Sequence, residues 1–299
     1  MASRAPPQFA DAALAWYFVI VWGSGFIATK IGIQYAAPFT FLTLRFAFGV
    51  LCLIPVMFWL KPAWPQTRRE WAHIVIAGLL MHAIHLSGSH YAQYLGMSAG
   101  IAAVILALQP LATAVIAIRW FGERPTPRQW FGIALGFGGV ALIVWHKVDI
   151  RAITAGSLVA VLTGLAALTA GTLYQRRFCP RVDLRSGALI QFSASLVVLL
   201  PLSLAFEGMR VNWSWPLLGA IAFLVILASL LGVNALHTLM RHGEATRVTS
   251  MMYLPPIFAV ALEYLMFGVV PTGVAIIGIA VTSIGVALAM SKARLRIPS

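Results

Sequence analysis

The sequence predicts an all-α membrane protein with ten transmembrane helices, arranged as two inverted five-helix repeats. Two observations lead to this fold: the chain is unusually apolar, and its two halves match each other at one fixed offset. Of its 299 residues, 61% are hydrophobic and only 10% are charged, whereas a soluble domain carries about 25% charged residues. Too few polar side chains remain to cover a surface in water, so we expect a lipid bilayer to surround this chain.

The apolar stretches have the length of membrane-spanning helices, which is about 17–25 residues. They are apolar throughout, whereas the strands of a transmembrane β-barrel alternate apolar and polar residues. Backbone groups in hydrocarbon must be satisfied within each segment, and this requirement makes the stretches helices. Spans are predicted near residues 12–33, 38–60, 71–92, 98–118, 128–146, 156–174, 187–207, 216–238, 246–267 and 271–290.

An internal repeat divides the chain into residues 1–147 and 148–299. When the chain is shifted by 146 residues, 11 of the 22 positions from 121 to 142 are identical to their partners, against about two or three expected by chance. Each half holds five spans, an odd number, so the second half starts on the opposite side of the membrane. Such inverted repeats are common in secondary transporters, with the substrate site near mid-membrane. Alternatively, the duplication only builds a stable bundle, as in a channel or receptor.

The basic residues fix the expected orientation. A net charge of +13 would suggest nucleic-acid binding in a soluble protein, but here the charges are dispersed over short loops, so no nucleic-acid partner is expected. With a cytoplasmic N-terminus, sixteen of the 21 lysines and arginines lie in inside segments and four in outside segments, while Arg45 lies within a helix. The positive-inside rule therefore predicts that both termini are cytoplasmic.

The third span carries a stripe of polar residues on one helix face, and we interpret it as part of a substrate site. Polar side chains in hydrocarbon face a cavity or another helix, because lipid cannot satisfy them. The second half has alanine or leucine at the equivalent positions of the two histidines and the serine, which favours an asymmetric substrate over symmetric packing. Interhelical hydrogen bonding is the alternative. The stripe consists of Gly78, His82, His85, Ser89 and Gln93.

Four residues are predicted flexing points. Pro110 and Pro256 occupy equivalent positions midway along spans four and nine, where proline removes a backbone hydrogen bond and bends the helix. The stretch from Trp22 to Gly25 is predicted to break the first span, and Gly171 is the equivalent of Gly25. The alternatives are a static kink at the prolines and tight packing of small residues at the glycines.

Further substrate-binding candidates complete the predicted cavity. Trp22 could form an aromatic wall at mid-depth, and Gln109, Asn234 and Tyr253 could supply polar contacts. Among the eight acids, only Glu263 lies clearly inside a span, where we expect it to form a structural ion pair with Arg45 or Lys30.

Several function classes are disfavoured. There is no nucleophile with a base, no phosphate-binding loop and no nucleotide domain, so neither an enzyme nor an ATP-driven pump is expected, and no cofactor. His82 and His85 have the spacing of a metal pair, but no carboxylate or thiol lies nearby, so no metal site is predicted. Cys52 lies in a span and Cys179 in a loop, so no disulfide is expected.

Two motifs accompany the ten spans and the repeat: the stretch Trp22-Gly23-Ser24-Gly25-Phe26 and the turn Phe121-Gly122-Glu123-Arg124-Pro125. The second half keeps the Phe-Gly pair and the proline of this turn, but has Val269 in place of Glu123. Together these features resemble the EamA branch of the drug/metabolite transporter superfamily over nearly the whole chain.

Within that branch the chain is similar to YddG-type aromatic amino acid exporters. This resemblance implies export of aromatic and other neutral amino acids across the bacterial inner membrane, by alternating access through a central cavity, and we expect a monomer to suffice. Other members of the superfamily move drugs or other metabolites. Its four-helix drug antiporters use a glutamate in the first helix, and here the first span has no acid after Asp11.

Overall fold

The computed structural model describes residues 8–121, 126–149, 153–232 and 254–289, and its regular elements there are helices. A single β-bridge joins Ala36 to Val211. The helices of the first half are α1 (Gln8–Gly32), α2 (Pro38–Leu60), α3 (Arg68–Gly78), η1 (Leu79–Ile84), α4 (His85–Tyr94), α5 (Ala99–Leu106), α6 (Gln109–Phe121) and α7 (Pro127–Asp149).

The second half repeats this order, and each described helix falls within or close to a predicted span. Its helices are α8 (Ala155–Phe178), α9 (Leu184–Leu202), η2 (Ser203–Glu207), α10 (Trp215–Ala222), η3 (Phe223–Gly232), α13 (Leu254–Phe267) and α14 (Gly273–Ala289).

In the described part of the chain, five helical stretches are long and apolar enough to cross a membrane, in agreement with the predicted helical membrane class. Three further apolar helices are shorter in the described part of the chain. The five long ones cover Pro38–Leu60, Arg68–Tyr94, Ala99–Ile116, Ala155–Phe178 and Leu184–Glu207.

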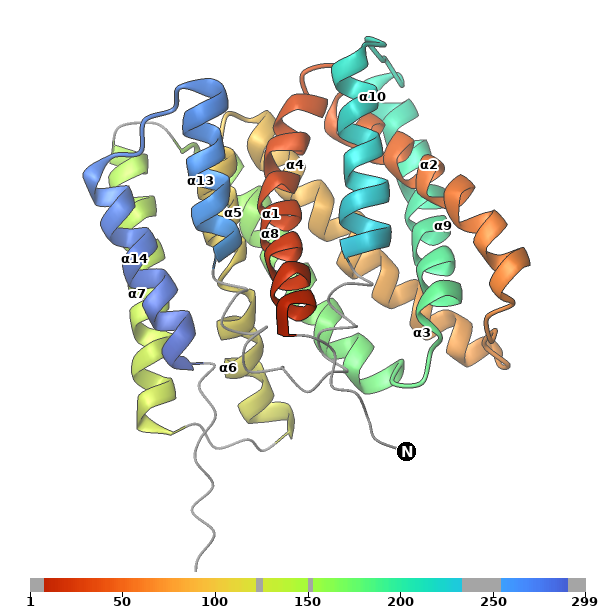
Figure 1. Cartoon of the computed structure of the whole chain (residues 1–299), viewed down its shortest axis with the longest axis horizontal. Coiled ribbons are helices and arrows are strands. Elements are labelled where there is room, and N and C mark those ends of the chain that lie inside the picture. The colour runs from red at the N-terminus through yellow and green to blue at the C-terminus, as the bar shows by residue number, and fades with distance from the viewer. Residues whose placement is uncertain (1–7, 122–125, 150–152, 233–253, 290–299) are drawn as a thin grey trace, which may run out of the picture.

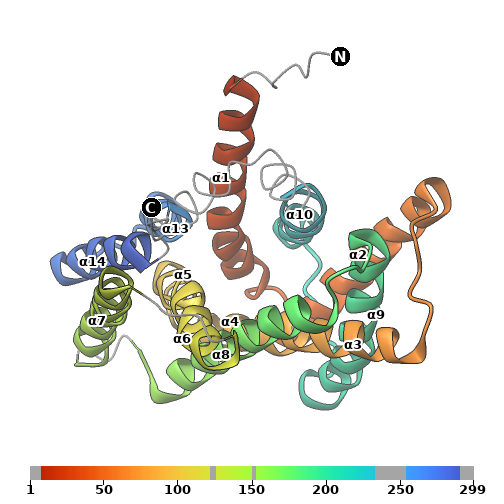
Figure 2. The same ribbon diagram turned by 90° about the horizontal axis from the view of Figure 1, so that it is seen from below.

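The helices run up and down between two ends of the molecule. The connections between α1 and α2, α9 and α10, and α13 and α14 lie at the top of Figure 1, whereas those between α2 and α3 and between α8 and α9 lie at the bottom. Viewed from below, α1 stands between α13 and α10, and α4, α8 and α3 form a row behind it (Figure 2). Helix α1 contacts both of its flanking helices.

Among the described residues, three helices contain π-helical segments, in which hydrogen bonds between residues five apart widen the backbone spiral. Segment η1 lies between α3 and α4, and the offset of 146 residues moves its range, 79–84, into η3. Equivalent helices of the two halves are therefore distorted at the same place. Segments of this kind inside α-helices occur frequently at functional sites.

The proline prediction and the glycine prediction have different outcomes. Helix α5 ends at Leu106 and α6 begins at Gln109, so the fourth span is interrupted directly before Pro110, as predicted. The predicted break in the first span is wrong, because α1 continues through Gly23 and Gly25. A Cβ atom on Gly23 would lie 2.8 Å from the Pro255 carbonyl oxygen, so this glycine provides a close approach to α13.

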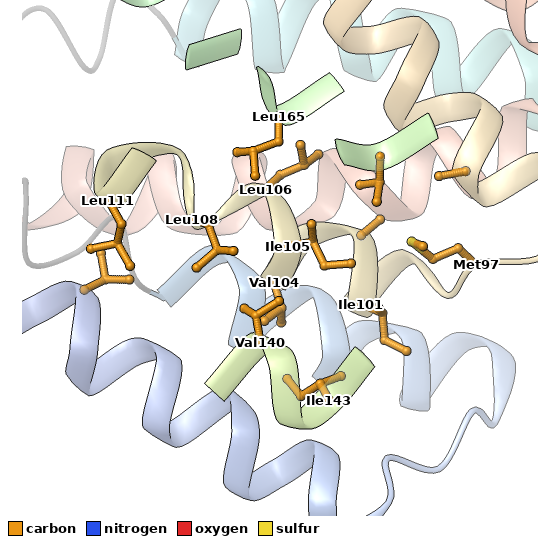
Figure 3. Packing of buried hydrophobic residues seen from close by; sticks show 14 of the residues in the cluster. Met97, Ile101, Val104, Ile105, Leu106, Leu108, Leu111, Val140, Ile143 and Leu165 are labelled. Atoms are coloured by element: carbon orange, nitrogen blue, oxygen red, sulfur yellow. The ribbon is translucent and has the colours of Figure 1, made fainter. Parts of the chain in front are cut away.

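Buried apolar side chains from helices of both halves form the largest described core cluster. Figure 3 shows Ile105 and Leu108 among side chains from α7 and α8, with α14 beside them. The turn between α5 and α6 thus lies inside the packed region, where Leu108 contributes to the cluster despite being outside a helix.

Helices α7 and α14 pack through glycines that occupy equivalent positions in the two halves. A Cβ atom on Gly132 would lie 2.6 Å from the Gly285 carbonyl oxygen, and one on Gly139 would lie 2.8 Å from the Gly278 carbonyl oxygen. Since Gly278 is the repeat partner of Gly132 and Gly285 that of Gly139, the contacts are reciprocal. They also require the two helices to run antiparallel.

The same reciprocity appears between α2 and α9. Phe46 and Phe192 are repeat partners at the offset of 146 residues, and their ring centroids lie 5.3 Å apart. Equivalent residues contact each other where a local two-fold axis passes between them.

The glycine contact predicts a sharp difference between neighbouring residues of α7. Alanine at position 139 would place Cβ 2.5 Å from Thr282 Oγ1, whereas Gly138 has no atom within 4 Å of the same position. Overpacking costs about 1–3 kcal/mol, while alanine otherwise favours a helix over glycine by about 0.5–1 kcal/mol. Gly139→Ala should therefore lower the melting temperature in detergent, and Gly138→Ala should leave it equal or higher. Equal melting temperatures for both variants would contradict the packing.

Candidate functional site

The first histidine of the polar stripe lies in η1 and is hydrogen-bonded across two other helices. His82 Nε2 lies 3.1 Å from Oε1 of Gln191 on α9, and the Gln191 amide nitrogen donates to Gln175 Oε1 on α8 at 3.1 Å. Because the Gln191 amide nitrogen is already a donor to Gln175, its oxygen accepts the proton of His82 Nε2. The His82 ring also packs edge-on against Phe46 and Phe192.

The second histidine is fixed by a backbone carbonyl. His85 Nδ1 donates to the Gly164 carbonyl oxygen of α8 at 3.0 Å, so in the neutral ring Nε2 is an acceptor. This contact depends on Gly88 and Gly164, which bring α4 and α8 together without side chains between them. Ser89 lies in the same interface and is 4% exposed.

The far end of α4 buries two more polar side chains. His90 Nε2 lies 3.5 Å from Thr29 Oγ1 on α1. Within the described part of the chain, His90 Nδ1 and the amide group of Gln93 have no hydrogen-bond partner. Polar groups that are buried in this way are costly unless water or a ligand reaches them.

Two further predicted residues lie on other helices. The Gln109 amide nitrogen, at the start of α6, donates to Thr113 Oγ1 at 3.2 Å and to Thr172 Oγ1 on α8 at 3.3 Å. Trp22 on α1 is 40% exposed, with its ring 4.9 Å from that of Phe18. Asn234 and Tyr253 lie outside the described residues.

The predicted glycine flexing points both pack against π-helical segments. A Cβ atom on Gly171 of α8 would lie 2.5 Å from Met81 Cγ in η1, and one on Gly25 of α1 would lie 3.6 Å from Leu224 Cδ2 in η3. Pro256 lies in the first turn of α13, which begins at Leu254; residues 233–253 lie outside the described ranges. Equivalent glycines thus contact equivalent distorted segments.

The predicted ion pair of Glu263 is confirmed, with Lys30 as its partner at 2.6 Å. The buried carboxylate also accepts hydrogen bonds from Ser98 Oγ at 2.7 Å and from the backbone nitrogens of Ala99 and Gly100 at 3.0 and 2.9 Å. The two backbone nitrogens are free N–H groups at the start of α5, where a negative charge is favourable. One carboxylate therefore links α1, α5 and α13.

A second carboxylate with a similar role was not predicted from the sequence. Glu207 accepts hydrogen bonds from the backbone nitrogens of Phe39 and Thr40 at 3.0 and 2.7 Å, and from Thr40 Oγ1 at 2.8 Å. It thereby caps the N-terminus of α2 from the end of η2. An acid at a span end gives no sequence signal for such a distant contact.

Arg45 was predicted only as a possible partner of Glu263, and its contact is different. Its Nη2 atom donates to Ser229 Oγ in η3 at 3.3 Å. The next residue along α2, Phe46, has its ring centroid 5.9 Å from that of His82. Arg45 therefore joins α2 to η3 beside the polar stripe, in the same region as the predicted site.

A groove with a volume of about 320 Å³ opens near this region, but none of the predicted site residues lines it. It lies between α2, α4, α8 and α9, and its polar side chains are Ser87, Tyr91 and Thr163. Among the described residues, no group of three metal-ligating side chains occurs, and both cysteines are free. Burial raises the pKa of the Cys179 thiol, which makes its reactive thiolate scarcer.

A comparison with protein families finds the EamA-like transporter family twice in this chain, over residues 12–145 and 154–291. The chain is 27% identical over 244 residues to "Uncharacterized inner membrane transporter YedA" of Escherichia coli, covering 81% of this chain and 78% of that protein. It is 26% identical to "Probable amino-acid metabolite efflux pump" of Salmonella typhimurium, covering 90% of each chain. The family description and the names of these two relatives indicate a transporter rather than an enzyme.

A solved crystal structure has a similar fold, with a TM-score of 0.63 at 17% sequence identity. The match covers 95% of this chain and 98% of that one.

The contacts of Glu263 predict that replacing it with glutamine, which has nearly the same shape, strongly destabilises the protein. Glu263→Gln leaves the Lys30 ammonium without its counterion and weakens the acceptor for the α5 N-terminus. Breaking a buried ion pair costs about 3–5 kcal/mol, so the melting temperature should fall markedly, and adding Lys30→Met should restore part of it. Asp183→Asn, which changes an exposed helix cap, is the control and should cost far less. A Glu263→Gln variant with the wild-type melting temperature would refute the role of these contacts.

Proposed function

The chain belongs to the EamA-like transporter family, and we propose that it exports aromatic and other neutral amino acids across the bacterial inner membrane. Export would proceed by alternating access, in which two inverted five-helix halves exchange conformations around a central site. The protein would act as a monomer, without a cofactor.

The observation that carries this proposal is the reciprocal packing of equivalent helices. Gly132 contacts Gly285 as Gly139 contacts Gly278, and Phe46 contacts its own repeat partner, Phe192. Two halves related by a two-fold axis in the membrane plane would pack in this way. The two separate family matches, over residues 12–145 and 154–291, support the same division.

The proposed substrate site combines the polar stripe with its neighbours. A zwitterionic amino acid needs a few polar partners in a site that is otherwise apolar. Relatives named for amino-acid metabolite efflux support this substrate class, and aromatic residues make up 11% of the chain. The proposed site residues are Trp22, His82, His85, Ser89, Gln109, Asn234 and Tyr253.

The proposed motion uses the irregular parts of the helices. Pro110 and Pro256 would let spans four and nine bend, since neither proline can donate a backbone hydrogen bond. Gly25 and Gly171 would let α1 and α8 slide along η3 and η1, because neither residue has a side chain of its own to block movement past Leu224 or Met81. Packed helices that shift by small sliding movements are a common route to domain motion.

The proposed orientation places both termini in the cytoplasm. The connections after α2 and α8 lie at one end of the molecule (Figure 1), and together with the helix turns that flank them they hold seven basic residues: Lys61, Arg68, Arg69, Arg176, Arg177, Arg181 and Arg185. Relatives named as inner membrane transporters support a bacterial inner-membrane location.

Two alternatives lead to different measurements. The substrate could instead be a drug or another metabolite, since the superfamily moves several classes. The same helices could also form a channel-like facilitator, which would show high flux without saturation or counterflow. A carrier saturates and exchanges substrate across the membrane.

Reconstitution into liposomes tests the proposal directly. We expect saturable uptake of labelled phenylalanine, accelerated by unlabelled phenylalanine loaded inside, measured with and without a pH gradient. A rate independent of the gradient would indicate uniport. The absence of saturable uptake for every amino acid tested would refute the substrate class.

The polar stripe predicts that His85 is needed for transport. His85→Ala should lower uptake at least tenfold, because Nε2 is the free acceptor on this face, and the melting temperature should fall only modestly. Tyr94→Ala, at the exposed end of the same helix, is the control and should transport normally. Unchanged uptake by the His85→Ala variant would remove the stripe from the site.

A further inference from the structure

Arg45 lies inside the membrane-spanning part of α2. It is seven residues from the first residue of that helix, which at about 1.5 Å per residue is about 10 Å from its end. The side chain then reaches Ser229 in η3. Both residues are only partly buried, so neither is completely sealed by neighbouring side chains.

Every acid whose side chain the structure describes is already engaged elsewhere. Glu263 pairs with Lys30, Glu207 caps α2, and Glu70 and Asp183 cap α3 and α9. Asp11, Glu123, Asp149 and Glu244 lie outside the described side chains, at or beyond the ends of the predicted spans. Within the described region, therefore, no carboxylate neutralises the Arg45 guanidinium.

A guanidinium in this position is expensive. It stays charged at any physiological pH, and charged groups inside a membrane generally pair with one another or mark a substrate pathway. The nearest described partner, Ser229 Oγ, is neutral and itself donates to the Leu224 carbonyl oxygen at 2.9 Å. This hydroxyl can therefore accept from Arg45 and fix its direction, but it cannot supply a counter-charge.

The repeat gives an internal comparison for Arg45. Its partner at the offset of 146 residues is Gln191, and each side chain reaches a π-helical segment of the opposite half: Arg45 reaches η3 and Gln191 reaches η1. The glutamine is neutral and is bonded at both its oxygen and its nitrogen. A cation at position 45 is thus not required by the packing of these helices.

We propose that Arg45 binds the carboxylate of the transported amino acid, with Ser229 holding the guanidinium in place. The guanidinium has five N–H donors in a planar fork that matches a carboxylate, and only one described hydrogen bond uses them. His82 Nε2 and His85 Nδ1 are already engaged in hydrogen bonds, so the other ring nitrogens, His82 Nδ1 and His85 Nε2, would accept from the substrate ammonium group. This inference rests on the proposed function and adds that the site selects α-carboxylates over amines and amides.

The test compares competitors that differ only in the carboxylate. In proteoliposomes, phenylalanine should inhibit uptake of labelled phenylalanine at least tenfold more strongly than phenylalaninamide or phenethylamine does. Arg45→Gln should remove this preference by raising the KM for phenylalanine at least tenfold, while inhibition by the amide changes little. Arg45→Lys should keep part of it, since the charge remains but the fork is lost.

The control is Arg185→Gln, which removes one positive charge from the exposed start of α9 and should keep the preference. The melting temperature of each variant reports folding. If Arg45→Gln does not fold, the wild-type competitor series still decides, because equal inhibition by the acid and the amide would overturn the inference. Wild-type protein that transports no amino acid would instead refute the proposed function.

Discussion

The packing between helices of opposite halves depends on residues too small to keep the backbones apart. At the α7–α14 contact, four glycines meet in reciprocal pairs, and at the α4–α8 contact Gly88 and Gly164 lie directly against each other. In a bilayer, lipid chains are as apolar as the side chains they replace, so close packing and interhelical hydrogen bonds hold helices together. Close approach also places His85 within reach of the Gly164 carbonyl oxygen. The position of the polar stripe therefore follows from the glycines.

This near-symmetric scaffold carries asymmetric chemistry. Segments η1 and η3 occupy equivalent positions, but the first contains His82 where the second has Ala228. Arg45 and Gln191 likewise occupy equivalent positions, and only the first is charged. In the proposed function, the symmetry would supply two halves that exchange conformations, and the unmatched polar groups would supply a site for a substrate that has no symmetry of its own.

The helices, the repeat and the Lys30–Glu263 pair were predictable, because span length, a fixed offset and an isolated membrane carboxylate are all visible in the sequence. The π-helical segments were not, since hydrophobic stretches in lipid carry little periodicity to show a local change of pitch. The glycines after Trp22 suggested a break in α1, but a glycine equally allows another helix to pack closely. The sequence does not show which of the two roles a glycine has, because this depends on the neighbouring helix, here α13. The sequence did not indicate the proposed role of Arg45, because its partner Ser229 lies 184 residues away.

The inverted arrangement is the central claim, and one labelling experiment tests it most directly. Gln66 and Asn212 are repeat partners, and both are exposed in connections between helices. Single cysteines at these positions, with Cys52 and Cys179 replaced by serine, can be probed with a membrane-impermeant maleimide in intact cells and in inverted vesicles. In the inverted arrangement, position 212 should be labelled only from the periplasmic side and position 66 only from the cytoplasmic side. Labelling of both positions from the same side would contradict it.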